Sequence, residues 1–419
     1  MFTRRFPLAL SAGLICLAVV FFVPHAGADA VIDWNQTAAD IIAGGKIPPG
    51  IQIRAMAVVQ VAVHEAVSAI SGRYPAYRFK IPAAPGASLD AAVASANRKT
   101  LLALVPSQQA AIEAAYQAFL TKIPDGPARL SGIDIGEKAA AALVAYIAED
   151  GMVVPNTYRP QATPGLYVPT AMPATPQWGL RRTWLLQRPD QFRPGAPPRL
   201  TSDVYARDYN EIKALGARTS ATRTAEQTEI AGFWEAAGSS MFWPVVRSVA
   251  SGVAGRDASD NALLLAVYGM AEDDAIIATF DAKYAFNFWR PLTAIRNGDI
   301  DGNAATDRDA AWMPFIETPP HPEYPCAHCV AAGVTAAVLE AVIGSGPVQW
   351  LSSPSPSAPN AVHHWAQLSD IVTEVRMARI YDGVHFRNST EVGAALGKKV
   401  GDWAVRTFLK PALLSAKAP

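Results

Sequence analysis

Apolar residues recur every three or four positions through most of the chain, which is the periodicity of amphipathic helices. Between Trp34 and Ile147 this spacing predicts a run of helices, including a rich apolar stretch at Ile51–Ile70. Leu89–Phe119 and Ile133–Ile147 are rich in alanine and also predict helices. Because a proline inside a helix removes a backbone hydrogen bond, we expect the first of these two to break near Pro106.

The second half of the chain carries the same signal. Helices are predicted at Asp203–Leu215, Glu226–Ala237, Asp257–Phe280 and Glu391–Leu409. Asp257–Phe280 is apolar on nearly all sides, which predicts a central, buried helix. Strand signals are scarce and no internal repeat is found. The sequence therefore predicts an all-α helical bundle, with the functional site between helices of the C-terminal half.

Polar residues interrupt this pattern at three places. Segments 297–309 and 344–360 are rich in loop-forming residues and are expected to be loops. Asp273 and Asp274 lie inside the central helix. Two alternatives remain for them: one orients an arginine of the functional site, or both lie on a solvated face.

Two segments do not follow the helical pattern. Residues 153–200 are dense in proline but also contain tyrosine and tryptophan, so we expect an ordered connector that wraps the core and helps to shape the substrate entrance. Residues 1–30 combine two arginines, a short apolar stretch and small residues at candidate cleavage sites, as secretory signal peptides do. A retained N-terminal anchor is the alternative. The remainder divides into an N-terminal helical part at 31–200 and a C-terminal helical bundle at 201–412.

The charge composition argues against nucleic acid as a partner. Of the 419 residues, 36 are Lys or Arg and 36 are Asp or Glu, so the formal net charge is zero. A nucleic-acid surface or a polybasic membrane patch requires an excess of positive charge. After residue 30, no segment is expected to span a bilayer.

The candidate chemistry lies between residues 280 and 385, where cationic and imidazole side chains gather without an acidic cluster of metal-binding spacing. These side chains are Lys283, Arg290, His328, Arg379 and His385. Arginine and lysine match the oxygens of a phosphate-like anion, and histidine supplies a nucleophile or proton carrier near neutral pH. The combination predicts a tetrahedral-oxyanion site.

Local spacing predicts how these side chains are placed. Lys283 and Arg290 are seven residues apart, close to two helical turns, so we expect them on one face of one helix. Gly383 offers a helix stop, which places His385 at or before the start of a new helix. Pro325 is expected to open an apolar helix, whose free N–H groups bind anions.

Three motifs in this region resemble those of the vanadium-dependent haloperoxidases and the related type 2 phosphatidic acid phosphatases. The family pattern is Lys-x6-Arg-Pro, then Pro-Ser-Gly-His, then Arg-x5-His. Here the three motifs run from Lys283 to Pro291, from Pro325 to His328 and from Arg379 to His385. The flanking Asn-Phe-Trp-Arg-Pro and Pro-Pro-His-Pro-Glu-Tyr-Pro are similar to the haloperoxidase branch in particular.

The resemblance implies a role for each motif residue. His385 would bond vanadate in a haloperoxidase, or take the phosphoryl group in a phosphatase. His328 would be the acid–base residue. The residues expected to hold the oxygens of the anion are Lys283, Arg290, Cys326, Ala327 and Arg379. One cage can serve both chemistries because pentacoordinate vanadate mimics a phosphoryl-transfer transition state.

The chain departs from the family pattern at three positions. Cys326 replaces the family serine and Ala327 the family glycine, and cysteine is both a weaker hydrogen-bond donor and oxidisable by peroxide. Ser389 lies four residues after the last motif histidine, where relatives commonly have aspartate. His321 occupies a halide-side position, which among relatives accompanies bromide enzymes.

The thiol pair in Cys326-Ala-His-Cys329 leaves three alternatives open. The two residues could form a disulfide, join His328 at a soft metal, or pack as small buried side chains.

Three functions follow from these residues. The first is an exported, periplasmic or secreted haloperoxidase that oxidises halide with hydrogen peroxide at a vanadate bound to His385, without haem. The second is a soluble phosphomonoesterase with His385 as nucleophile, acting on a phosphomonoester without vanadate. The third is a non-catalytic or thiol-redox relative that uses Cys326 and Cys329.

Overall fold

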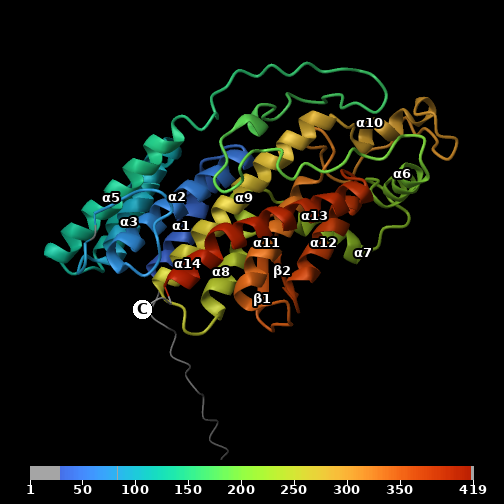
Figure 1. Ribbon diagram of the computed structural model, residues 1–419. Coiled ribbons are helices and arrows are strands. Elements are labelled where there is room, and N and C mark those ends of the chain that lie inside the picture. Colours follow the sequence, from blue (N-terminus) through green and yellow to red (C-terminus); the bar gives the residue numbers. More distant parts are fainter. Residues whose placement is uncertain (1–28, 83, 417–419) are drawn as a thin grey trace, which may run out of the picture.

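The protein is a bundle of helices with one short hairpin (Figure 1). The computed structural model describes residues 29–82 and 84–416. The signal peptide expected at 1–30 lies outside these residues, except for Asp29 and Ala30, which begin the first helix. The helices of the N-terminal part are α1 (Ala30–Gly44), α2 (Pro49–Ser71), α3 (Leu89–Leu104), α4 (Gln109–Leu120) and α5 (Pro127–Ile147).

The C-terminal part contains most of the remaining elements. Its helices are α6 (Asp203–Leu215), α7 (Ala225–Phe233), α8 (Trp243–Gly252), α9 (Ala258–Phe286), α10 (Pro291–Arg296), α11 (Ala327–Ile343), α12 (Leu368–Tyr381), α13 (Arg387–Ala404) and α14 (Lys410–Ser415). The short helical turns are η1 (Pro106–Gln108), η2 (Trp178–Leu180), η3 (Gly238–Ser240), η4 (Gly298–Ile300) and the π-helical η5 (Val405–Leu409). The predicted helical fold is confirmed, including the break near Pro106, whereas α8 was not predicted.

Helix α9 is the central element of the bundle. Nearly all of its residues are buried, as its all-round apolar sequence predicted. It packs against α2 on the side of the N-terminal part and against α11 and α13 on the other side (Figure 1). Glycines allow α11 and α13 to pack backbone against backbone, because a Cβ at Gly397 would lie 2.0 Å from the carbonyl oxygen of Val330.

The connector at 153–200 is held to α9 by buried carboxylates. Asp274 accepts the backbone N–H groups of residues 184, 185 and 186 at 2.7–2.8 Å. Asp273 accepts two hydrogen bonds from the Arg181 guanidinium, at 2.8 and 2.9 Å. Both predicted alternatives for this acidic pair were therefore wrong, because the two carboxylates are fully buried and bind the connector instead of a site arginine or solvent.

A two-stranded antiparallel hairpin replaces most of the loop expected at 344–360. It consists of β1 (Leu351–Ser355) and β2 (Ala358–Trp365). His363 on β2 contacts Glu374 of α12 at 2.7 Å and Glu229 of α7 at 2.9 Å, and its ring stacks on Phe233. The hairpin thereby joins two helices that flank the site.

One helix in the described ranges, α2, has the length and apolar composition to cross a membrane. Of its most apolar stretch, 89% is buried inside the protein, as in the core helix of a globular bundle.

Candidate functional site

The first motif spans a helix end, not one continuous helix. Lys283 lies in the last turn of α9, and Asn287 ends that helix with φ of 49°. Arg290 is the residue before α10. The expectation of one helix face was therefore wrong, because α9 ends at a left-handed asparagine between the two cations.

The second motif forms the start of α11. Cys326 is the N-cap residue, and its Sγ accepts the backbone N–H of Cys329 at 3.2 Å. The helix thus begins at Ala327, two residues after Pro325 and close to the expected position. The N–H groups of Ala327 and His328 belong to the first helical turn, where no intrahelical acceptor exists.

The third motif bends between α12 and α13, as the glycine predicted. Arg379 lies in the last turn of α12, and His385 precedes the N-cap of α13. Gly383 has φ of 79°, and a Cβ there would lie 2.3 Å from the carbonyl oxygen of Gly216. Only glycine satisfies both conditions.

Backbone carbonyls of the segment before α11 hold the first two cations together. Lys283 Nζ donates to the oxygens of Pro322 at 2.7 Å and Glu323 at 2.9 Å. Arg290 Nε donates to the oxygen of His321 at 2.8 Å. The two cations therefore converge on the same three residues, although they come from different helices.

Arg290 also joins this segment to the third motif. Its Nη1 donates to the oxygen of Val384 at 2.8 Å and lies 3.1 Å from His385 Nε2. A guanidinium has no lone pair, so Nε2 must be the acceptor and the neutral ring carries its proton on Nδ1. His385 Nδ1 lies 2.9 Å from Glu323 Oε1, which can accept that proton.

Arg379 is the third cation of this group. Its Nη1 donates to the oxygen of Trp234 at 3.0 Å and pairs with Asp382 at 2.6 Å. Its Nε is buried with no acceptor in the described part of the chain. This donor is oriented by its neighbours and is free to bind a further group.

Burial and mutual repulsion shift the pKa values of these groups. Burial lowers the pKa of His385 well below its ordinary value, and the charges of Arg290, Lys283 and Arg379 lower it further. Burial, followed by the charge of Arg290, also lowers the pKa of Lys283. An anion placed among these groups would offset the repulsion.

Two buried carboxylates accompany the cations, and the sequence analysis identified neither. Burial raises the pKa of Glu323 to about 7, against the opposing charges of Lys283 and Arg290. Burial likewise raises the pKa of Asp382 to about 7, although Arg379 opposes the shift. The positive surplus of the site must therefore decrease as pH rises through neutrality.

Comparisons with known proteins bear on the fold that surrounds these residues. Residues 263–412 match a family model described as the VCPO second helical-bundle domain. This stretch of the C-terminal bundle is therefore similar to the second helical-bundle domain that this family model describes. The matched residues lie inside the predicted 201–412 unit and include all three motifs. No curated protein matches the chain.

Solved structures extend the haloperoxidase fold to most of the chain. The first bacterial vanadium-dependent iodoperoxidase superimposes with a TM-score of 0.76 at 22% identity, over 90% of this chain and 96% of that one. A holo-type bacterial vanadium-dependent chloroperoxidase gives 0.70 at 18% identity, over 89% and 96%. The predicted fold is confirmed, while the roles of individual site residues remain predictions.

The donor set of this helical bundle fits an oxyanion. Two guanidinium groups, one ammonium group and the first-turn N–H groups of α11 are all donors. The described residues contain no group of three or more His, Cys, Asp or Glu side chains that could hold a metal cation. The soft-metal alternative for His328 and the two cysteines is therefore not supported.

Both cysteines are free thiols and fully buried. The disulfide alternative is thus not realised in this structure, and the small-residue packing alternative is. Burial opposes ionisation of Cys326, but its contact with Cys329 and the charge of Arg379 lower its pKa below the usual thiol value. Burial raises the pKa of Cys329.

Two histidines lie at the accessible edge of the site. His328 and His321 are partly exposed, whereas the cations beneath them are buried. His328 Nε2 lies 3.1 Å from the oxygen of Ala236, so Nε2 carries the proton and Nδ1 the lone pair. His321 Nδ1 lies 3.0 Å from Arg290 Nη2, which makes Nδ1 an acceptor and leaves Nε2–H free to donate.

The connector passes beside this edge. Ala174 N–H donates to the oxygen of Pro320 at 2.7 Å, and Tyr284 hydroxyl donates to the oxygen of Ala174 at 2.7 Å. Met172 nearby in the chain is largely exposed. The connector therefore lies beside the segment that carries His321, and its role at a substrate entrance stays a prediction.

Proposed function

We propose that the protein is an exported haloperoxidase that binds vanadate on His385 and oxidises halide with hydrogen peroxide. The observation that carries this proposal is the convergence of Lys283, Arg290 and Arg379 around His385 inside a haloperoxidase bundle. The balanced charge of the whole chain supports a site for small anions and gives no support for a nucleic-acid surface.

The three cations would hold the oxygens of vanadate and neutralise their charge. Arg379 supplies the unpartnered Nε, and Lys283 has three ammonium hydrogens for two carbonyl acceptors. His385 Nε2 supplies the lone pair once Arg290 Nη1 turns from the ring to the anion. When bound, vanadate supplies a Lewis-acidic centre that activates hydrogen peroxide.

His328 would handle protons at the edge of the site. Burial and the charge of Arg379 lower its pKa well below the ordinary value, so the ring is neutral and Nδ1 accepts a proton. A bound anion would raise that pKa by attraction, which lets His328 take a proton from hydrogen peroxide and return it later. The Ala327 N–H would donate to an oxygen of the anion.

His321 is proposed as the halide-side residue. Its Nε2–H is a free donor, since Arg290 occupies Nδ1. Its ring packs beside Phe280, with centroids 5.2 Å apart, at the edge bordered by the connector. The similar solved structures include an iodoperoxidase and a chloroperoxidase, so the test must compare chloride, bromide and iodide.

The second candidate is a phosphomonoesterase with His385 as nucleophile. Cys326 favours it, because a thiol with a lowered pKa beside Arg379 is exposed to oxidation whenever peroxide occupies the site. A phosphatase does not handle an oxidant. The thiol-redox alternative is less well supported, because complete burial of both sulfurs hinders exchange with another thiol.

A vanadate titration of the purified protein tests the proposal. We expect bromination of a dye by peroxide and bromide to depend on vanadate and to be inhibited by phosphate. Hydrolysis of p-nitrophenyl phosphate that vanadate inhibits, without bromination, would favour the phosphatase instead. Absence of both bromination and phosphate-ester hydrolysis would contradict both functions.

Export is proposed from the sequence of residues 1–30 alone. Expression of the full chain in a bacterial host, followed by fractionation and mass spectrometry of the N-terminus, would test it. A shortened protein in the periplasm or medium is expected. Full-length protein in the membrane fraction would support the retained anchor.

A further inference from the structure

Glu323 makes two hydrogen bonds that reach the core of the site. Its Oε1 accepts from His385 Nδ1 at 2.9 Å and from the backbone N–H of Phe386 at 3.0 Å. Glu323 is fully buried and His385 is 1% exposed. The carboxylate therefore accepts hydrogen bonds from both the imidazole ring of His385 and the backbone N–H of the next residue.

This contact determines which nitrogen of His385 faces the anion. The Nδ1–H donates to Glu323, and Nε2 keeps its lone pair toward Arg290 Nη1. Only that tautomer can bond vanadium or attack phosphorus through Nε2. We propose that Glu323 is a positioning residue that fixes the tautomer and orientation of His385 for oxyanion bonding. This rests on the proposed oxyanion site, whichever of its two reactions is correct.

The other oxygen of Glu323 faces a second polar group. Glu323 Oε2 and Ser389 Oγ are both buried with no hydrogen-bond partner in the described ranges. Both residues line a cavity of about 10 Å³, together with Tyr205, whose hydroxyl is also without a partner. Such a cavity has room for about one water molecule with several polar partners. One water would satisfy the carboxylate on the side away from His385.

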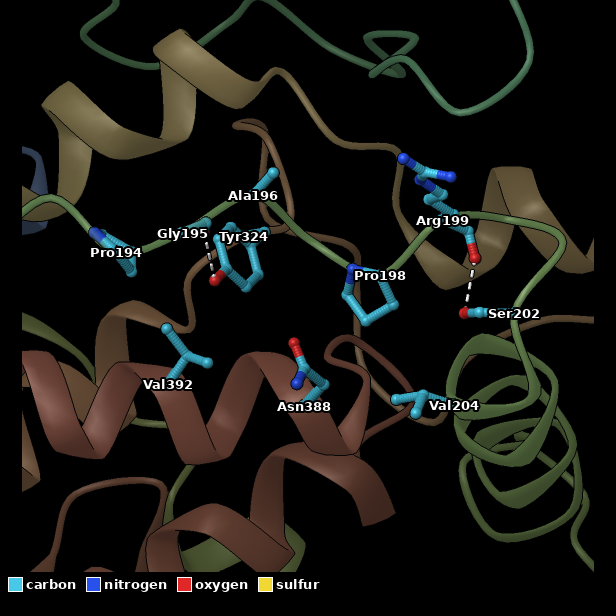
Figure 2. A pocket seen from close by; sticks show the side chains of 10 residues that line it. All are labelled: Pro194, Gly195, Ala196, Pro198, Arg199, Ser202, Val204, Tyr324, Asn388 and Val392. Atoms are coloured by element: carbon cyan, nitrogen blue, oxygen red, sulfur yellow. Dashed lines mark hydrogen bonds between the residues drawn. The ribbon is translucent and has the colours of Figure 1, made fainter.

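This small cavity adjoins a larger pocket of about 500 Å³ between the connector and α13. Figure 2 shows Tyr324 and Asn388 in the larger pocket, and both residues also line the small cavity. The Tyr324 hydroxyl donates to the oxygen of Gly195 at 2.8 Å. The small cavity beside the Glu323 carboxylate and the larger pocket therefore share lining side chains.

Ser389 is a position at which a new carboxylate could replace the one lost in Glu323→Ala. It follows His385 by four residues in the chain and lines the same cavity as Glu323. An aspartate there would place a carboxylate in the space that Glu323→Ala vacates. In the wild type, Glu323 supplies the carboxylate beside His385 from a segment 62 residues away in sequence.

The first test reads the tautomer directly, in protein without vanadate. Long-range proton–nitrogen NMR correlations on ¹⁵N-histidine protein, assigned with His385→Gln, should show His385 protonated on Nδ1 at pH 8. Glu323→Ala should lose this signature, and adding Ser389→Asp should restore it. Glu272→Gln is the matched control, since Glu272 is an equally buried carboxyl of α9 with no hydrogen bond to the site.

The second test separates positioning from a merely structural role. In Glu323→Gln, which keeps the shape of the side chain, vanadate affinity should fall by about 10- to 100-fold. Phosphate affinity should not fall, because phosphate is held without a bond to Nε2 and loses a repulsive charge. Calorimetry measures both affinities.

Two results would overturn the assignment. One is an unchanged Nδ1–H signature in folded Glu323→Ala. The other is an equal loss of vanadate and phosphate affinity in Glu323→Gln. If the wild type binds neither anion, the proposed function fails, but the NMR test of the Glu323–His385 contact still gives its own answer.

Discussion

Glu272 provides a quantitative test of how α9 buries charge. Both carboxyl oxygens are buried without a hydrogen-bond partner in the described part of the chain, in contrast to the neighbouring Asp273 and Asp274. Burial raises the pKa of Glu272 from 4.5 to about 8, and the adjacent charge of Asp273 adds to the shift. The folded protein therefore holds a proton on Glu272 that the unfolded chain has already released at neutral pH.

The sign and size of the effect follow from that difference. Below about pH 4.5 both states are protonated and Glu272 has no pH-dependent effect; as pH rises toward 8, the folded state loses stability. One pKa unit corresponds to about 1.4 kcal/mol, so the loss is about 3 kcal/mol at pH 7. Glu272→Gln removes this loss, so its stability relative to wild type should increase by about 3 kcal/mol between pH 5 and pH 8.

Urea unfolding at several pH values measures this difference. Replacing the carboxyl by the amide of glutamine also changes packing, but this change in stability is the same at each pH. It therefore cancels when the pH dependence of the free energy of unfolding is compared between Glu272→Gln and wild type. Glu149→Gln, at an exposed site, is the control and should give parallel curves. If Glu272→Gln also ran parallel to wild type, the carboxyl would be hydrated or paired in solution, and the burial argument would be refuted.

Four further outcomes are expected. His385→Ala should abolish vanadate-dependent bromination, and retained activity would remove His385 from the site. Cys326→Ser should slow inactivation by hydrogen peroxide, since serine is not oxidised; an unchanged rate would place the sensitive group elsewhere. Burial disfavours protonated His363, but its two carboxylate partners raise its pKa above the ordinary value. Protonated His363 should therefore stabilise the folded protein below about pH 6.5, and this stabilisation should be lost as pH rises through the folded-state pKa. His363→Ala should therefore cost more in urea unfolding at low pH than at high pH. Sulfate remains a dianion between about pH 6 and about pH 8, so it should bind more weakly at about pH 8, where Asp382 is more often ionised. Asp382→Asn should reduce this difference in sulfate affinity. A sulfate affinity that calorimetry finds to be the same at both pH values would contradict this.

The positions of most helices were predictable because their apolar faces repeat along the chain. Asp203–Leu215 was predicted with the bounds that α6 has, and the break between α3 and α4 falls at a proline. The hairpin was missed because β1 and β2 consist largely of serine, proline, alanine and asparagine, which carry little strand signal. Its stability comes from tertiary contacts, such as those of His363, which no local pattern displays.

The first motif shows where spacing misleads and why convergence still follows. Seven residues suggested two helical turns, but Asn287 adopts a left-handed conformation and ends the helix before Arg290. Lys283 and Arg290 meet because the carbonyl oxygens of residues 321–323 accept hydrogen bonds from both. The acceptors lie more than thirty residues downstream, so the spacing of the motif contains no information about them.

Distance in sequence also explains why Glu323 was missed, whereas Asp382 was overlooked although it lies inside the third motif. The region from 280 to 385 showed no acidic cluster of metal-binding spacing, which favours an anion over a metal cation as the bound group. That pattern does not show that the cations lack acidic partners. Glu323 reaches His385 across 62 residues of sequence, and Asp382 pairs with Arg379 one helical turn away. An oxyanion site needs some acidic partners for its cations, because unpaired buried cations are costly. It must not have too many, because fully paired cations have no charge left for an anion. The buried carboxyls meet this need because each orients one site residue and changes its charge near the pH at which the site would work.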